Sequence, residues 1–229
     1  MRYSYLLFDA DGTLFDFEKT EHHAFKDTME KFEIPFSIEN LEMYKKINIS
    51  YWKQLEKGLI TKEALLPKRF ADFLTQIGRT DLFAVDLNIT YGSQLGKYGY
   101  LFPQALSLCK ELSMQYTLLL VTNGVYSTQI RRFDNSPIKP YFQEMIVSEK
   151  IGYTKPDPRY FDYVFEKYSI TDKSHVLIIG DSLSADIKGG RDYGIDTCFY
   201  NPFQTAIPEG ASTYVITQLE ELKNILAVQ

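Results

Sequence analysis

The chain has 229 residues, of which 45% are hydrophobic and 24% charged, and its formal net charge is −5. This composition supports a substantial hydrophobic core and argues against intrinsic disorder. The acidic balance gives no electrostatic footprint for a nucleic acid polymer. The basic doublets Lys45-Lys46 and Arg131-Arg132 are expected on solvated helix faces. The length fits one domain, or one domain that carries a smaller insertion.

Neither a membrane span nor a secretion signal is expected. The longest apolar runs, VLII at 176–179 and LLLV at 118–121, have the length of strands. Asp9 interrupts the N-terminal apolar run before it could serve as a signal peptide. Cys109 and Cys198 are isolated in the sequence, so we expect buried free thiols in a reducing compartment. The sequence therefore predicts a cytoplasmic protein that is a monomer or a small homo-oligomer.

In chain order, the first predicted element is a buried strand at residues 3–9 (YSYLLFD). Residues 18–95 then contain no good strand run, and they show helical periodicity instead. A block of this length is too long for a single crossover between two strands. We therefore expect an inserted α-helical cap subdomain over residues 18–95. Its predicted helices are 20–32, 38–57, 61–77 and 80–95.

The remaining chain alternates strands and helices. Its strand runs are rich in Leu, Ile and Val without strict alternation, as in parallel strands that helices cover on both faces. This pattern predicts an α/β fold, a doubly wound parallel sheet formed by residues 1–17 and 96–229. The further predicted strands are 116–122, 144–149, 175–181, 196–201 and 213–217. The further predicted helices are 104–114, 126–133, 158–168, 184–193 and 218–226.

Polar and charged residues follow the predicted strands where each one ends. In open parallel sheets, ligands bind in the crevice beyond the carboxyl ends of the strands. Each of these residues alone is weak evidence, but their collection at one edge of the sheet predicts a functional site. The residues are Asp9, Asp11, Thr122, Asn123, Lys155, Asp181 and Asp186.

The types of side chain in this set indicate which reaction the site could catalyse. Clustered carboxylates repel one another unless a divalent cation lies among them, and hard oxygen ligands favour Mg²⁺. A lysine and backbone N–H groups at glycine-containing turns suit the oxygens of a phosphate. One aspartate can attack phosphorus, and a second carboxylate can move protons. The chain has no GxxxxGK[ST] loop, no HExxH motif and no serine nucleophile elbow. The residues therefore predict Mg²⁺-assisted phosphoryl chemistry.

The segments DADGTLFD, VTNG, KPDP and GDSLSAD occur in this order and resemble the four motifs of the haloacid dehalogenase-like (HAD) phosphatase superfamily. The resemblance implies a Rossmann-like HAD core with a helical cap that closes over the site. It implies that Asp9 is the nucleophile and that Asp11 is the general acid/base. It also implies that Asp9, Asp181 and the backbone carbonyl of Asp11 bind Mg²⁺, with Asp186 supporting these ligands.

By the same resemblance, Thr122, Asn123 and Lys155 bind phosphate. Longer stretches, among them YWKQLEKGLIT and VSEKIGYTKPDPRYFDY, are similar to the noncanonical pyrimidine nucleotidases. That family removes the 5′-phosphate from pyrimidine nucleotides. The resemblance therefore implies a hydrolase of the phosphatase or 5′-nucleotidase class. Its partner would be a small-molecule phosphate monoester, namely a nucleoside monophosphate.

Three alternatives remain open at the level of the sequence. A phosphatase for phosphoglycolate or another sugar phosphate would share all four motifs. A haloacid dehalogenase uses the same aspartate on carbon without a metal, and Asp11 and Asp181 argue against it. A phosphorylation-switched receiver module also gathers Asp, Thr, Lys and Mg²⁺ on a parallel sheet. Its acceptor is expected mid-chain in a domain of about half this length, without an inserted cap.

Overall fold

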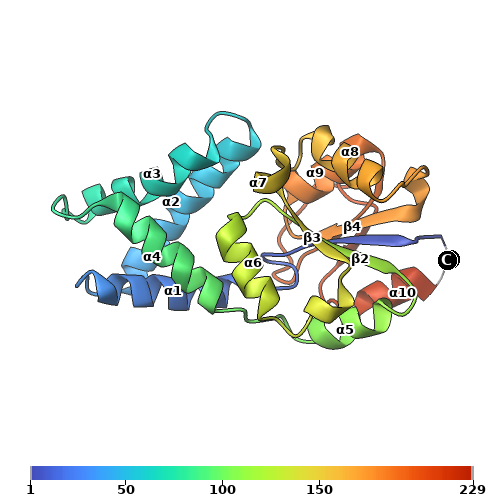
Figure 1. Ribbon diagram of the computed structural model, residues 1–229, viewed down its shortest axis with the longest axis horizontal. Coiled ribbons are helices and arrows are strands. Elements are labelled where there is room, and N and C mark those ends of the chain that lie inside the picture. Colours follow the sequence, from blue (N-terminus) through green and yellow to red (C-terminus); the bar gives the residue numbers. More distant parts are fainter. Residues whose placement is uncertain (1, 228–229) are drawn as a thin grey trace. The chain divides into compact units, whose positions relative to one another are not determined.

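The computed structural model of the protein describes residues 2–227, which divide into two compact units (Figure 1). One unit comprises Glu18–Tyr98, and its regular elements are helices. The other comprises the described residues on both sides of that segment and contains the whole sheet. Within this second unit, Leu14–Asp16 runs beside Tyr100–Phe102, with two backbone hydrogen bonds of 2.9 Å. The chain therefore leaves and re-enters the sheet unit through paired segments.

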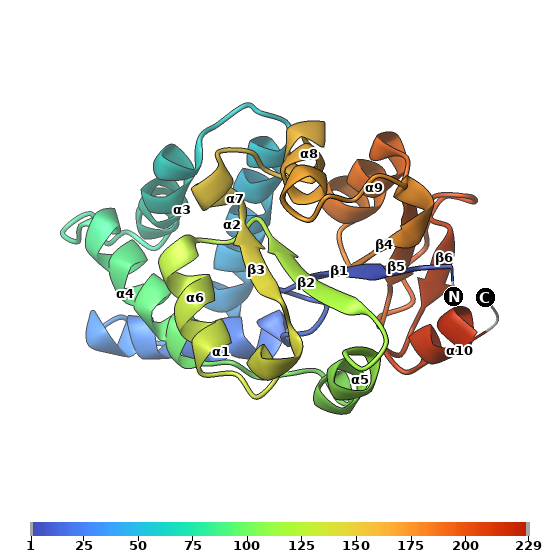
Figure 2. The same cartoon turned by 45° about the vertical axis from the view of Figure 1, so that its right-hand side comes forward.

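A six-stranded parallel sheet forms the centre of the second unit, in the order β3-β2-β1-β4-β5-β6 (Figure 2). The chain moves outward from β1 to β3 and then returns to begin the other half at β4. The carboxyl ends of β1, β2 and β4 therefore meet where the strand order reverses, and ligands of such sheets bind there. This confirms the predicted doubly wound sheet. Its strands are β1 (Tyr5–Asp9), β2 (Thr117–Thr122), β3 (Glu144–Val147), β4 (Val176–Gly180), β5 (Asp196–Tyr200) and β6 (Tyr214–Ile216).

Helices cover both faces of this sheet. Leu6 packs in a cluster with Leu108 of α5 and Leu222 of α10, whereas Leu7 packs on the opposite face with Phe161 of α8. Successive residues of a strand point to opposite faces, so a strand covered on both sides must be apolar throughout. The helices of this unit are α5 (Ala105–Leu112), α6 (Tyr126–Asp134), α7 (Ser148–Ile151), α8 (Pro158–Lys167), α9 (Lys188–Tyr193) and α10 (Glu221–Ala227). Further helical turns are η1 (Lys139–Tyr141), η2 (Lys173–His175) and η3 (Leu183–Ile187).

Near the ends of β3 and β4, two predicted elements differ in the structure. The strand predicted to continue to residue 149 ends at Val147, because its pairing with β2 ends there and α7 begins at the next residue. The helix predicted over 184–193 begins with the π-helical turn η3 before α9 follows. The Ser182 side chain accepts the Ala185 N–H, and the Asp186 carboxylate accepts the Ser182 N–H. These bonds wind the turn around Asp186.

The helical unit has a polar network in its interior. Glu21 Oε1 accepts hydrogen bonds from Asn48 Nδ2 at 3.2 Å and from the Tyr91 hydroxyl at 3.1 Å. Arg69 Nη1 donates to Asn48 Oδ1 at 2.8 Å, and its guanidinium lies over the Tyr91 ring. All four residues are buried, and the sequence did not predict this network. The helices of the unit are α1 (Phe17–Lys31), α2 (Ile38–Glu56), α3 (Lys62–Gln76) and α4 (Ala84–Lys97).

The structure bears on two expectations from the sequence, which concern membrane spans and the two cysteines. Among the helices of residues 2–227, none combines the length and the apolar character that a bilayer crossing requires. Cys109 and Cys198 are buried and free, as predicted, and burial raises the pKa of the Cys109 thiol to about 12. Both thiols are therefore core side chains.

Candidate active site

Asp9 lies at the end of β1, and Lys155 reaches it from the loop before α8. Lys155 Nζ donates to Asp9 Oδ1 at 2.7 Å, to Asp186 Oδ1 at 2.6 Å and to the Val121 carbonyl at 2.9 Å. All three ammonium hydrogens are thereby used. Burial alone would lower the pKa of Lys155, but the charges of Asp186 and Asp9 outweigh it and raise the pKa above its ordinary value. Lys155 is therefore a fixed positive charge beside Asp9.

Three carboxylates gather around this lysine. Asp9, Asp181 and Asp186 place oxygen atoms within 4.8 Å of one another. Burial raises the pKa of Asp9 well above its ordinary value, and Asp186 and Asp181 add to this against the opposing charge of Lys155. Loss of hydration and the charge of Asp186 also raise the pKa of Asp181. The cluster therefore carries more negative charge than one lysine compensates, and it fits a divalent cation.

The oxygen donors of this cluster suit Mg²⁺, which prefers carboxylates and water. Asp186 is already engaged through both oxygens, because Oδ1 accepts from Lys155 and Oδ2 accepts the Ser182 N–H at 3.1 Å. Asp181 Oδ1 accepts a longer bond of 3.3 Å from the Thr13 hydroxyl. Asp9 and Asp181 accept fewer hydrogen bonds than Asp186, so they are the side chains better placed to give an oxygen to a metal. Asp186 instead holds the lysine and the loop in place.

Two glycines make room for these carboxylates. A Cβ on Gly12 would lie 2.2 Å from Asp181 Oδ2, and Gly12 also has a φ of +83°. A Cβ on Gly180 would lie 2.2 Å from Asp186 Oδ2. Real side chains do not approach this closely, so both positions need glycine. The glycines at the ends of β1 and β4 therefore let the acids come together.

Thr122 ends β2 and Asn123 follows it, but the two side chains have different surroundings. The Thr122 hydroxyl accepts the Gly124 N–H at 3.0 Å, which leaves its own hydrogen to be donated. The Asn123 amide bonds both ways with the main chain of Lys155, donating to its carbonyl at 2.8 Å and accepting its N–H at 2.9 Å. The structure thus brings Asn123 to the backbone that carries the lysine.

The Asp11 side chain turns toward α6, where sequence reasoning had placed no functional residue. Gln129 Nε2 donates to Asp11 Oδ2, and Arg132 Nη2 donates to Asp11 Oδ1. The expectation that Arg132 lies on a solvated face is wrong, because this residue is only 2% exposed. One feature of the sequence could have indicated that α6 contributes to the site: this helix begins directly after the turn that follows β2.

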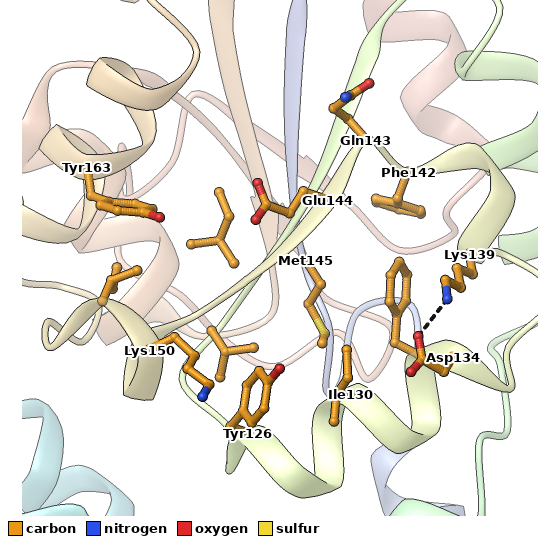
Figure 3. Close-up of a pocket in the computed structure, with 14 residues that line it drawn as sticks. Tyr126, Ile130, Asp134, Lys139, Phe142, Gln143, Glu144, Met145, Lys150 and Tyr163 are labelled. Atoms are coloured by element: carbon orange, nitrogen blue, oxygen red, sulfur yellow. Dashed lines mark hydrogen bonds and ion pairs between the residues drawn. The ribbon is translucent and has the colours of Figure 1, made fainter.

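A cavity of about 440 Å³ lies elsewhere in the same unit, along the outer edge of β3 (Figure 3). Met145 of β3, Ile130 and Tyr126 of α6, and Tyr163 of α8 contribute to its lining. Asp9, Asp181, Asp186 and Lys155 do not belong to this lining. The cavity is therefore separate from the candidate active site.

A doubly wound sheet with an aspartate ending its first strand, and with a lysine and further aspartates after later strands, is the arrangement of a known class of hydrolases. Residues 6–200 match the family described as haloacid dehalogenase-like hydrolase, and the chain belongs to this family. It is thus a HAD hydrolase, as the motifs implied.

Particular relatives are similar over the full chain. The chain is 40% identical to the HAD-hydrolase YfnB of Bacillus subtilis, covering 100% of this chain and 97% of that protein. A crystal structure of YfnB bound to magnesium superimposes with a TM-score of 0.93, covering 99% of this chain and 100% of the other. The chain is 30% identical to the pyrimidine 5′-nucleotidase YjjG of Escherichia coli, over 99% of both. It is 32% identical to the pyrimidine 5′-nucleotidase PynA of Streptococcus pneumoniae, over 99% of this chain and 98% of that protein.

Proposed function

We propose that the protein is a Mg²⁺-dependent phosphatase that hydrolyses pyrimidine nucleoside 5′-monophosphates through a phosphorylated Asp9. The observation that carries this proposal is the position of Asp9 at the end of β1. There it contacts Lys155 and lies with Asp181 and Asp186 in one carboxylate cluster. The names of YjjG and PynA support the choice of substrate.

The bound substrate phosphate would be held by the residues around Asp9. Lys155 supplies a fixed positive charge, Thr122 a hydroxyl hydrogen, and the turn after β1 its backbone N–H groups. Asn123 would act on the phosphate through Lys155, whose main chain it holds. A Mg²⁺ ion on Asp9, Asp181 and the Asp11 carbonyl would neutralise charge on the phosphate and on the carboxylates.

The reaction would then run in two steps. A carboxylate oxygen of Asp9 attacks phosphorus, and the bond from phosphorus to the 5′-oxygen breaks while Asp11 gives that oxygen a proton. Water next loses a proton to Asp11 and attacks the same phosphorus, which breaks the bond to Asp9 and releases phosphate. Both residues return to their starting states. We further propose that the helical unit Glu18–Tyr98 is the cap that selects the substrate.

A phosphate-release screen tests this function. The purified protein is given dUMP, AMP and phosphoglycolate, each with Mg²⁺ and with a chelator in excess. We expect release from dUMP to exceed release from the other two by more than about tenfold, and to disappear with the chelator. Equal rates on all three esters would contradict the pyrimidine assignment alone. A stable phosphoprotein without turnover would favour a receiver-like module, and no reaction at all would contradict the phosphatase assignment.

A further inference from the structure

Two side chains of α6 hold Asp11. Gln129 Nε2 donates to one carboxylate oxygen of Asp11, and Arg132 Nη2 donates to the other. Arg132 Nη2 also donates to Gln129 Oε1 at 2.9 Å. The three side chains therefore form a closed set of hydrogen bonds, although Asp11 and α6 are more than a hundred residues apart in the sequence.

The surroundings of Arg132 point to a role at Asp11. Its side chain is 1% exposed, and its guanidinium lies 4.5 Å from the centre of the Phe15 ring. Its Nε and Nη1 groups are buried without a hydrogen-bond partner among the described residues. Buried N–H groups without partners carry a free-energy cost. The bonded nitrogen of Arg132 donates to Asp11 and Gln129. Its buried position is therefore better explained by the contact with Asp11 than by the packing of the core.

The backbone near α6 leaves space for this arrangement. A Cβ on Gly124 would lie 2.1 Å from Gln129 Nε2 and 2.8 Å from Gln129 Cγ. A Cβ on Gly99 would lie 3.2 Å from Arg132 Cγ, which is already a tight approach. The glycine in the turn after β2 therefore admits the side chain that reaches Asp11. Gly124 and Gly99, which are distant in the sequence, thus leave room for Gln129 and Arg132.

We propose that Gln129 and Arg132 are positioning residues that fix the direction in which Asp11 presents its carboxyl group to the reacting oxygens. This inference rests on the proposed function, in which Asp11 gives a proton to the leaving oxygen and takes one from water. Proton transfer requires heavy atoms about 2.6–3.2 Å apart, so a freely rotating carboxyl group would be a poor donor. Each Asp11 oxygen keeps a lone pair beside the bond it accepts from α6, and the side chain is 27% exposed. Asp11 is thus both held and accessible.

Two substrates separate this role from a general effect on the fold. The 5′-alkoxide of dUMP is a poor leaving group that needs a proton, whereas p-nitrophenolate leaves without one. In the variants Gln129→Leu and Arg132→Met, we expect kcat for dUMP to fall about 100-fold. KM should change less than about threefold, because the phosphate ligands are intact. With p-nitrophenyl phosphate, p-nitrophenolate should appear in a burst of about one equivalent, followed by slow turnover, because water attack still needs Asp11. The matched control is Arg131→Met, an exposed arginine at the next position of α6, which should behave as wild type.

Each outcome decides the question. Equal losses on both substrates without a burst, or unchanged dUMP turnover, would overturn the inference while the wild-type activity upholds the proposed function. A higher kcat in the variants would also overturn it, since α6 would then hold Asp11 in an unproductive direction. If Arg132→Met does not fold, Gln129→Leu decides by itself, because it removes one bond to Asp11 and retains the buried arginine. A wild-type protein inactive on both substrates would overturn the proposed function and this inference together.

Discussion

Lys155 Nζ lies 2.6 Å from Asp186 Oδ1, and both side chains are 1% exposed. This ion pair joins the loop before α8 to the turn after β4. It also orients the lysine toward Asp9, so the proposed nucleophile depends on an acid that does not itself need to touch the phosphate. A fully buried pair of this kind is sensitive to the loss of either partner, because the remaining charge has no water to compensate it.

The first prediction concerns the loss of the lysine. Lys155→Met leaves Asp9 and Asp186 as buried acids without their cation, so we expect the free energy of unfolding to fall by about 3–5 kcal/mol at neutral pH. Saturating Mg²⁺ should recover part of this loss, because it supplies positive charge to the same carboxylates. Urea unfolding with and without Mg²⁺ measures both effects. The exposed Lys150→Met is the control, with a change within about 0.5 kcal/mol. A Lys155→Met protein as stable as wild type would contradict this reading of the cluster.

The second prediction concerns Gly180. Its Cβ would lie 2.2 Å from Asp186 Oδ2 and 2.6 Å from Asp186 Cβ, so Gly180→Ala must displace the whole acid. We expect a loss of about 1–3 kcal/mol in stability and a large loss of phosphatase activity, because Lys155 loses its anchor. Gly58→Ala is the control: Gly58 has a φ of +67°, but no atom lies within 4 Å of the new Cβ. This control should lose stability and keep its activity. Full activity in folded Gly180→Ala would show that the position of Asp186 is unimportant.

The third prediction concerns metal binding. The raised pKa of Asp181 means that its ionised form lowers stability in the metal-free protein above that pKa. Asp181→Asn should therefore raise Tm without metal in mildly alkaline buffer. It should also abolish the further rise with Mg²⁺, which in wild type corresponds to about 2.7 kcal/mol at a metal concentration 100-fold above Kd. Thermal unfolding across a Mg²⁺ titration measures this. Asp192→Asn, an exposed acid on α9, should retain the wild-type response. An unaltered Mg²⁺ response in Asp181→Asn would exclude Asp181 as a ligand.

The fourth prediction concerns Glu21 in the helical unit. Burial raises the pKa of Glu21 from 4.5 to about 7, against the hydrogen bonds from Tyr91 and Asn48. Between these values the folded state binds more protons than the unfolded state, so stability falls as pH rises through that window. Glu21→Gln lacks this loss. The variant should match wild type near pH 4.5 and exceed it by up to about 3 kcal/mol above pH 7.

Trp52, the single tryptophan of the chain, lies in α2 and reports on the unfolding of the helical unit. Urea titrations followed by its fluorescence at several pH values measure the Glu21 effect. Glu30→Gln changes an exposed acid of the same helix and should show no such pH dependence. A constant difference between Glu21→Gln and wild type at every pH would mean that Glu21 does not titrate in this window.

The sheet and most of the strand ends could be predicted because a strand that is buried on both faces appears in the sequence as a short, continuous apolar run. The apolar run at 116–122 became β2, Thr117–Thr122, since a strand between two helical layers has no exposed face to vary. The residues that end β1, β2 and β4 are also local, so their meeting at one edge follows from parallel pairing alone. The family motifs gave the expected chemistry of the same residues.

The contacts between distant segments could not be predicted from the same signals. Arg132 resembled a solvated helical arginine because its partner Asp11 lies 121 positions earlier, and no spacing connects the two. The interior of the helical unit was missed for the same reason. Glu21 and Arg69 are charged residues on helices, which the sequence alone would place in solvent. Both are buried, because residues of other helices surround them. Helical periodicity predicts which faces are apolar, but it does not identify a buried polar network.

The most direct test of the proposed mechanism is to identify the residue that receives the phosphoryl group. The protein is mixed with p-nitrophenyl phosphate and Mg²⁺, quenched in acid and reduced with borohydride, which converts an aspartyl phosphate to the corresponding alcohol. The peptide that contains Asp9 is then examined by mass spectrometry, with Asp9→Asn as the control. We expect the reduced product at position 9 in wild type, and no product and no turnover in folded Asp9→Asn. Phosphate release with Asp9 unmodified, with the label on another residue, or with activity retained in Asp9→Asn would contradict the assignment of Asp9 as the nucleophile.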